Sequence, residues 1–144
     1  MKRYQKTVLS SSKIKETQNR YELFEARTVK FAMDVRCLLR MTHKNVLNMD
    51  DIRQLLRSSG SVAANHIEAN NALSVKDCLN RMKICRKEVK ESILWLKLLI
   101  FEREEVSQLE KREDLLREAD QLARIFTTIT EKLKVRLKKG DEMF

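Results

Sequence analysis

Proline is absent from this 144-residue chain, and glycine occurs only at Gly60 and Gly140. Because proline and glycine supply most tight turns, the chain has few places for the many turns that sheets and barrels need. Aromatic residues make up only 6% of the sequence, whereas charged residues make up 35%. This composition is typical of long helices joined by short links, within one domain large enough for a sizeable core. The hydrophobic residues, 42% of the chain, recur at regular spacing, which argues against disorder throughout.

Cysteine is also scarce, and Cys37, Cys78 and Cys85 form an odd set without the C-x-x-C spacing of a redox or zinc motif. Because the sequence has no evident secretory signal, we expect reduced thiols and a cytoplasmic protein. We expect Cys78 and Cys85 to be small core residues rather than nucleophiles or zinc ligands. The longest apolar run, residues 93–101, is interrupted by Lys97 and has about half the length that a bilayer span needs. No membrane partner is therefore expected.

Positive charge is in excess, with a formal net charge of +9, and it is unevenly distributed. Residues 1–20 hold six basic groups and one acidic group, so this segment alone carries +5. We interpret residues 1–18 as a basic flexible tail, residues 19–139 as the helical domain and residues 140–144 as a short C-terminal tail. A basic tail either contacts the phosphate groups of nucleic acid or serves as a solubilising arm.

Hydrophobic periodicity predicts four helices, over residues 21–41, 51–70, 75–102 and 106–138. Each predicted helix has an apolar stripe at helical spacing. The stripe of the first helix is Phe24, Thr28, Phe31, Val35 and Leu38, and that of the second is Ile52, Leu55, Val62 and Ala69. The stripe of the third is Val75, Leu79, Met82, Val89, Ile93 and Leu96, and that of the fourth is Leu115, Ala119, Leu122, Phe126, Ile129 and Leu133. We expect an N-cap for the second helix within residues 48–50, Ser74 as the N-cap of the third, and Gly140 at the end of the fourth. Short links between amphipathic helices predict an all-α, antiparallel, up-down-up-down four-helix bundle.

Two features of the predicted helices indicate close contacts. Gly60 lies in the middle of a helix, where it costs about 1 kcal/mol relative to alanine, and small residues surround it. We therefore expect the backbone of another helix to approach it closely. On the third helix, Cys78, Cys85 and Ser92 form a stripe beside the main apolar one, and we interpret this stripe as a surface for self-association.

Polar residues form two further stripes on neighbouring predicted helices. The first contains Arg57, Ser61, Asn65 and Glu68, and the second contains Glu88, Glu91 and Trp95. If these faces meet, the arginine and the hydroxyl and amide groups can satisfy the carboxylates, and the network then fixes the register of the two helices. The alternative is that the stripes line a ligand pocket or an interface.

The sequence offers no complete set of catalytic or metal-binding residues. A di-iron bundle needs Glu-x-x-His units, and neither His43 nor His66 follows a glutamate by three residues. Arg36 and His43 match the spacing of the Arg-x4-6-His motif of some helical ribonucleases, but Cys37 stands where a polar residue is usual. Phosphate-binding loops and nucleophile elbows are absent. We expect no enzyme activity, cofactor or metal, and a helical ribonuclease remains the remote alternative.

Three segments of the chain resemble a known family of four-helix bundles, named after proteins encoded in intervening sequences of 23S ribosomal RNA. The segments are YELFEARTVKFAMDVR (21–36), RSSGSVAANHIEAN (57–70) and SVKDCLNRMKICRKEVKESILWLKLL (74–99). The third includes the family's elements at Lys87, Glu88, Glu91, Trp95 and Leu96. The resemblance extends over residues 21–135 and is weak in the fourth helix. The chain departs from the family in lacking a proline near Thr42 and in having His66 where an aromatic or aliphatic residue is usual.

The resemblance implies a homopentamer with helices roughly parallel to a central axis, and no established enzyme activity. A related branch, the accessory variability proteins of diversity-generating retroelements, consists of basic pentamers that partner a reverse transcriptase and its template RNA. The expected function is therefore binding of nucleic acid, RNA before DNA, or of an RNA-handling protein such as a reverse transcriptase. The alternative is a structural or protein-interaction subunit that does not bind nucleic acid. The candidate nucleic-acid contacts are Lys2, Arg3, Lys6, Lys13, Lys15, Lys83, Arg86, Lys87, Lys90, Lys132, Lys134, Arg136, Lys138 and Lys139.

Overall fold

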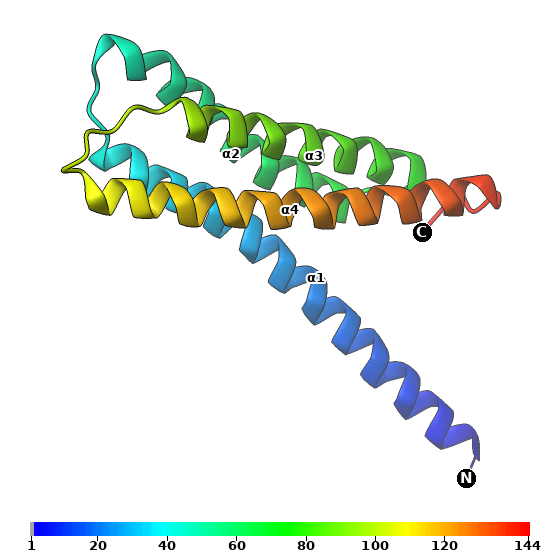
Figure 1. Cartoon of the computed structure of the whole chain (residues 1–144). Coiled ribbons are helices and arrows are strands. Elements are labelled where there is room, and N and C mark those ends of the chain that lie inside the picture. Colours follow the sequence, from blue (N-terminus) through cyan, green and yellow to red (C-terminus); the bar gives the residue numbers. More distant parts are fainter. Residues whose placement is uncertain (1) are drawn as a thin grey trace.

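The computed structural model describes residues 2–144, with side chains from Lys13 onward. Its helices are α1 (Lys2–Met41), α2 (Val46–Asn70), α3 (Val75–Leu98) and α4 (Val106–Lys138). No strand occurs among the described residues, so the predicted all-α class and four-helix bundle are confirmed. Figure 1 shows the second half of α1 within the bundle, while its first half projects away from the other helices.

The four helices enclose one core. Helix α1 contacts α2 and α4, and α3 contacts the same two helices, but the backbones of α1 and α3 do not come close to each other. These two therefore lie diagonally across the bundle. Each helix contributes large, fully buried side chains, among them Phe31, Leu55, Leu96 and Phe126. Burying one such side chain contributes roughly 1.5–3 kcal/mol, so packing of the predicted stripes is the main source of stability.

Helix α1 begins at Lys2, so the predicted start at Tyr21 is wrong. Nothing in the preceding residues stops a helix, because they contain no proline or glycine. The Arg20–Glu16 ion pair, at 3.4 Å, has the i,i+4 spacing that supports an exposed helix. Side chains 13–23 are all exposed, so this part of α1 contributes nothing to the core. The segment predicted as a tail is thus a helical extension, and its flexibility stays a prediction.

The start of α2 also differs from the prediction, because Asn45 rather than a residue within 48–50 caps it. The Asn45 side chain accepts a hydrogen bond from the Asn48 backbone N–H at 3.0 Å. Asn48 itself is fully buried and joins the two links at this end of the bundle. Its Nδ2 donates to the carbonyls of His43 and Ile100, and its Oδ1 accepts from the Ile100 N–H at 2.9 Å.

The other helix ends follow the sequence more closely. Ser74 caps α3 by accepting a hydrogen bond from the Asp77 N–H at 3.1 Å, as predicted. Gly140, with φ of 78°, follows the last turn of α4, also as predicted. Helix α3 ends at Leu98, before the predicted Glu102, because Asn48 holds the backbone of Ile100 in a link.

The close contact expected at Gly60 exists, but its partner is a side chain rather than a backbone. A Cβ atom at this position would lie 3.2 Å from Nη2 of Arg36, which reaches across from α1. The small residue therefore makes room for a guanidinium group. An alanine here would require Arg36 to shift.

The stripe that we interpreted as a self-association surface lies inside the bundle, so that interpretation is wrong. Cys78, Cys85 and Ser92 are all buried. The Ser92 hydroxyl lies 2.8 Å from that of Ser58 on α2, and Cys85 lies 3.6 Å from the Val62 carbonyl. The stripe is buried because α3 packs against two helices and needs a wider inner face. Cys78 and Cys85 are therefore core residues, as expected, and burial raises the pKa of the Cys85 thiol to about 12.

Candidate functional site

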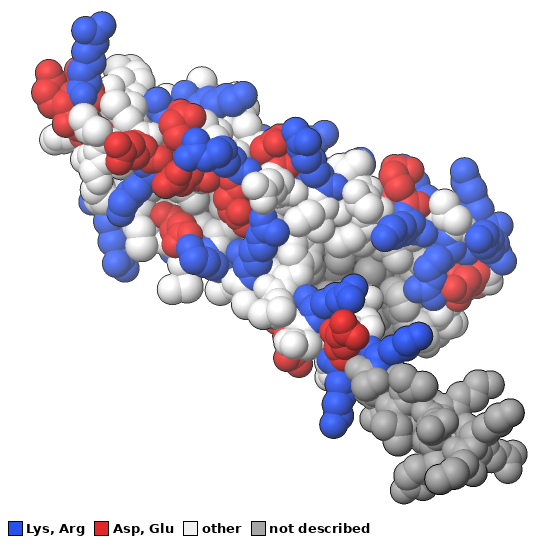
Figure 2. All heavy atoms as spheres, turned by 60° about the horizontal axis from the view of Figure 1, so that its bottom comes forward, with Lys and Arg blue, Asp and Glu red and all other residues white. Residues whose placement is uncertain are grey.

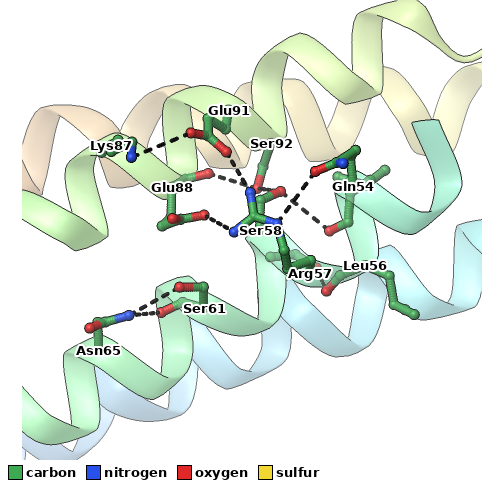
Figure 3. A network of polar contacts seen from close by, with 12 residues as sticks. Gln54, Leu56, Arg57, Ser58, Ser61, Asn65, Lys87, Glu88, Glu91 and Ser92 are labelled. Carbon is green, nitrogen blue, oxygen red and sulfur yellow. Dashed lines mark hydrogen bonds and ion pairs between the residues drawn. The ribbon is translucent and has the colours of Figure 1, made fainter. Parts of the chain in front are cut away.

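Arg57 of α2 lies between two glutamates of α3, as Figure 3 shows. Its Nη1 donates to Oε2 of Glu88 at 3.2 Å, and its Nη2 donates to Oε2 of Glu91 at 2.6 Å. Gln54 accepts from Nε at 3.4 Å, and the Lys87 ammonium lies 3.9 Å from Glu91. Only 9% of the Glu88 side chain is exposed, and a carboxylate so placed needs a cationic partner. The structure thus brings together the arginine and both glutamates of the predicted network.

The rest of the two polar stripes forms a second group further along the helices. Asn65 donates to the carbonyl and hydroxyl oxygens of Ser61. Arg81, which we did not predict, donates to Asn65 and forms an ion pair with Glu68. Its position seven residues before a network glutamate is the signal that could have indicated it. Trp95 takes no part: it packs against the core, and its buried Nε1 has no hydrogen-bond partner among the described residues.

These contacts join α2 to α3 rather than present groups to a ligand. Both glutamates already have a guanidinium partner, and Ser58 and Ser92 share a buried hydrogen bond just below them. Hydrogen-bonded ion pairs of this kind set helix register more than they add net stability. The geometry therefore favours the structural interpretation of the stripes over a pocket.

A second polar group, His66, lies within an aromatic cluster of the core. Its ring centroid is 4.5 Å from that of Phe24 and 5.7 Å from that of Phe126. The Thr28 hydroxyl donates to the Glu25 carbonyl, so Nδ1 of His66, 3.2 Å from that hydroxyl, is assigned as the donor to it. This tautomer leaves Nε2 buried without a partner among the described residues. Burial lowers the pKa of His66, and the charge of Glu25 acts weakly in the opposite direction.

The two residues of the ribonuclease-like spacing lie in different surroundings. Arg36 donates through Nη1 to the Ala32 carbonyl at 2.9 Å, which directs the guanidinium back along α1. His43 lies in the exposed link after the end of α1. The hydrogen bond of the arginine therefore points away from the histidine rather than toward it.

A groove of about 530 Å³ lies between α1 and α4. Its charged lining is mixed in sign and consists of Arg27, Lys30, Lys111, Asp34, Asp114 and Glu118. Arg27 donates to both carboxylate oxygens of Glu118, at 2.6 and 3.0 Å, and this bond raises the pKa of the arginine. Lys30 is likewise paired with Asp34. The opposite charges largely satisfy one another within the groove.

The candidate nucleic-acid contacts occupy three helices. Those on α1 lie on its projecting part: Lys13 and Lys15 are exposed, whereas the side chains of Lys2, Arg3 and Lys6 lie outside the described ones. On α3 three are exposed and one is half-buried: Lys83, Lys87, Lys90 and Arg86. On or just after α4 the set is Lys132, Lys134, Arg136, Lys138 and Lys139. No helix in the described part of the chain is both long and apolar enough to span a bilayer.

Two of the candidates on α4 are already engaged within the chain. Lys134 lies 2.9 Å from Glu131 and lowers the pKa of that carboxyl. Arg136 donates to Asp141 at 2.7 Å, which raises the pKa of the arginine, and its guanidinium lies 5.0 Å from the centre of the Phe144 ring. Figure 2 looks at the underside of the view in Figure 1, and basic and acidic side chains are interspersed there.

Comparison with known proteins supports the fold more than the function. Neither models of protein families nor curated proteins give a match to this chain. A similar solved structure is that of a protein of unknown function from the S23 ribosomal protein family of Bacteroides thetaiotaomicron. It is 26% identical, the likeness covers 74% of this chain and 96% of that one, and the TM-score is 0.62. The class defined here is thus a four-helix bundle related in fold to that protein.

Proposed function

We propose that this chain is an antiparallel four-helix bundle that assembles with copies of itself and binds nucleic acid, RNA first, without a reaction of its own. The distribution of charge carries the proposal. Helix α3 has seven basic and three acidic side chains, so it carries +4, and residues 1–20 carry +5. Together they account for the whole net charge of +9, and the rest of the chain is neutral. Positive charge gathered on two elements is what phosphate binding requires.

Self-association is supported by the exposed side of α1. Ala26, Val29, Met33 and Cys37 follow one another at steps of three and four and are all exposed. Met33 alone is 61% exposed. An apolar stripe of this kind on a packed helix is a typical surface for contact with a second copy. The resemblance to the intervening-sequence family makes a pentamer the expected assembly.

The experiment is a salt titration of RNA binding by the intact chain, measured as fluorescence anisotropy of a labelled RNA. We expect tight binding at low salt and a steep, linear fall of log K with log salt concentration. Light scattering on the same samples gives the mass of the free protein and of the complex. Absence of RNA binding at low salt would refute the proposal.

A second candidate function is that of an accessory subunit that binds a protein such as a reverse transcriptase. A groove of about 770 Å³ where α2 meets α3 favours it, because Leu73 at its edge is 80% exposed. This candidate predicts an oligomer that does not respond to nucleic acid. A gene next to a reverse transcriptase and a template repeat would favour it, whereas a position inside a ribosomal RNA gene would favour the other branch of the resemblance.

A further inference from the structure

Four lysines of α3 are spaced by seven residues. They are Lys76, Lys83, Lys90 and Lys97, and all are exposed. Seven residues are nearly two helical turns, so consecutive members lie about 10.5 Å apart and drift by only about 20° around the helix. They therefore form one nearly straight row about 31 Å long, which we call the lysine row. Lys76 and Lys97 were not among the residues predicted from the sequence to bind nucleic acid, although the seven-residue spacing could have indicated them.

The lysine row has no acidic partners among the described residues. The ion pairs made by basic residues of α3 involve Arg81 and Lys87 instead. Two of the three acidic residues of the helix, Glu88 and Glu91, are held by Arg57 on the side that faces α2. The polar network therefore has an electrostatic consequence as well as a structural one, since it keeps these two negative charges off the lysine side of the helix.

The position of α3 also leaves the row accessible in a self-associated protein. Helix α3 packs against α2 and α4, and its backbone stays away from that of α1, so the exposed row lies on the side of the bundle away from α1. The apolar stripe of α1 and the lysine row can thus serve two different contacts. Two copies of the row would repel each other, which makes it a poor surface for contact between identical chains.

We propose that the lysine row is the main contact for the phosphate backbone of nucleic acid and that it binds without reading sequence. Lysine is a flexible point charge that neutralises phosphates without the bidentate geometry of arginine. A regular linear row of such charges matches a polymer whose negative charge also repeats along a line. The one aromatic residue between Lys76 and Lys97 is Trp95, which packs against the core, so base stacking adds nothing along the row. This inference rests on the proposed function and names the surface that performs it.

The test compares the intact chain with two quadruple variants of equal net charge. The row variant carries Lys76→Gln, Lys83→Gln, Lys90→Gln and Lys97→Gln. The control variant carries glutamine at four exposed basic residues that are not among the candidate contacts: Arg40, Lys44, Arg103 and Lys111. Lysine and glutamine have similar helix propensities, and circular dichroism checks that both variants stay folded.

Binding is measured against salt concentration for an RNA duplex and for a single-stranded RNA of equal length, which separates the two sources of phosphate. We expect the row variant to bind about tenfold or more weakly, with a log–log slope reduced by about 1 for each phosphate that a lysine no longer neutralises. The control variant should keep most of the slope. Equal losses in both variants would overturn the lysine row while leaving nucleic-acid binding intact. Polyglutamate that competes as well as RNA at equal charge would also overturn it, and an intact chain that binds neither RNA would refute the proposed function itself.

Discussion

Glu88 is a nearly buried carboxylate that depends on one exposed partner. Arg57 supplies the nearest positive charge at 3.2 Å, and it is itself 52% exposed. We expect Arg57→Ala to lower the free energy of unfolding by about 1–3 kcal/mol, less than for a fully buried pair because water reaches the arginine. Urea unfolding measures this loss.

The controls for this prediction use the same chain. Arg53→Ala removes a surface pair with Asp50 at 3.1 Å and should cost well under 1 kcal/mol. Glu88→Gln in the Arg57→Ala background should recover part of the loss, because a neutral amide costs less to bury than a carboxylate. Equal effects of Arg57→Ala and Arg53→Ala would show that the network is energetically no more than a surface pair.

His66 gives the protein a pH-dependent stability through one side chain. Because burial lowers the pKa of the folded-state histidine, the unfolded chain binds more protons once the pH falls below the ordinary value of 6.5. Stability therefore decreases as the pH falls through that value, until the folded histidine is also protonated. We expect His66→Phe to flatten this decrease by up to about 1.4 kcal/mol per unit of pKa shift, measured by urea unfolding at pH 7.5 and pH 5. The control His43→Ala, in the exposed link, should show the same dependence of stability on pH as the wild type. If His66→Phe also shows the wild-type dependence, His66 is not its cause.

Sequence patterns located these residues better than they described their environment. Spacing placed Arg57 on one helical face and Glu88 and Glu91 on another, because a helical face is a local property of the chain, but whether the two faces meet stayed open until the structure showed it. The burial of His66 and the contact between Arg36 and Gly60 depend on which helix packs beside α2. No periodicity within one helix carries that information.

At the scale of the elements, one asparagine holds two links together. Asn48 makes three hydrogen bonds that connect the α1–α2 link with the α3–α4 link. Asn48→Ala removes all three and leaves backbone groups of Ile100 without their partner, so we expect a loss of about 2–4 kcal/mol in urea unfolding. Asn45→Ala removes only the α2 cap and should cost about 1 kcal/mol. Asn48→Asp keeps the acceptor but places a buried carboxylate oxygen against the carbonyls of His43 and Ile100, so it should lose at least as much as Asn48→Ala. An Asn48→Ala loss no larger than that of Asn45→Ala would contradict this role.

The helix ends show why boundaries were harder to predict than helices. Ser74 and Gly140 act within a few residues of their own positions, and both were predicted correctly. Asn48 was a candidate N-cap in the sequence, but its side chain instead accepts a hydrogen bond from the backbone of Ile100, in the link between α3 and α4. Helix α1 continues to Lys2 because its first half lacks any stop signal, even though the apolar pattern begins only at Phe24.

At the scale of the whole molecule, the lysine row and the apolar stripe of α1 lie on different sides of the bundle. The lysine row of α3 faces away from α1, and the exposed apolar stripe lies on α1 itself. Composition could predict the net charge but not this separation, because the separation depends on which helices are diagonal. This arrangement fits the proposed function, in which copies of the chain meet on one side and a polyanion binds on the other.

The proposed separation predicts that assembly can be broken without loss of the lysine row. Met33→Glu places a charge in the middle of the apolar stripe of α1, where 61% of the methionine is exposed, so the folded chain should tolerate it. We expect the wild type to scatter light as an oligomer, with five chains as the expected number, and the variant to scatter as a smaller species at the same concentration. Leu73→Glu, at a residue that is 80% exposed near the α2–α3 turn, is the matched control and should leave the mass unchanged.

Per chain, the Met33→Glu protein should still bind RNA at low salt, although more weakly where several copies contact one RNA. If Met33→Glu keeps the full mass, the α1 stripe is not the contact between copies, and if the mass falls only with Leu73→Glu, the contact lies at the α2–α3 turn instead.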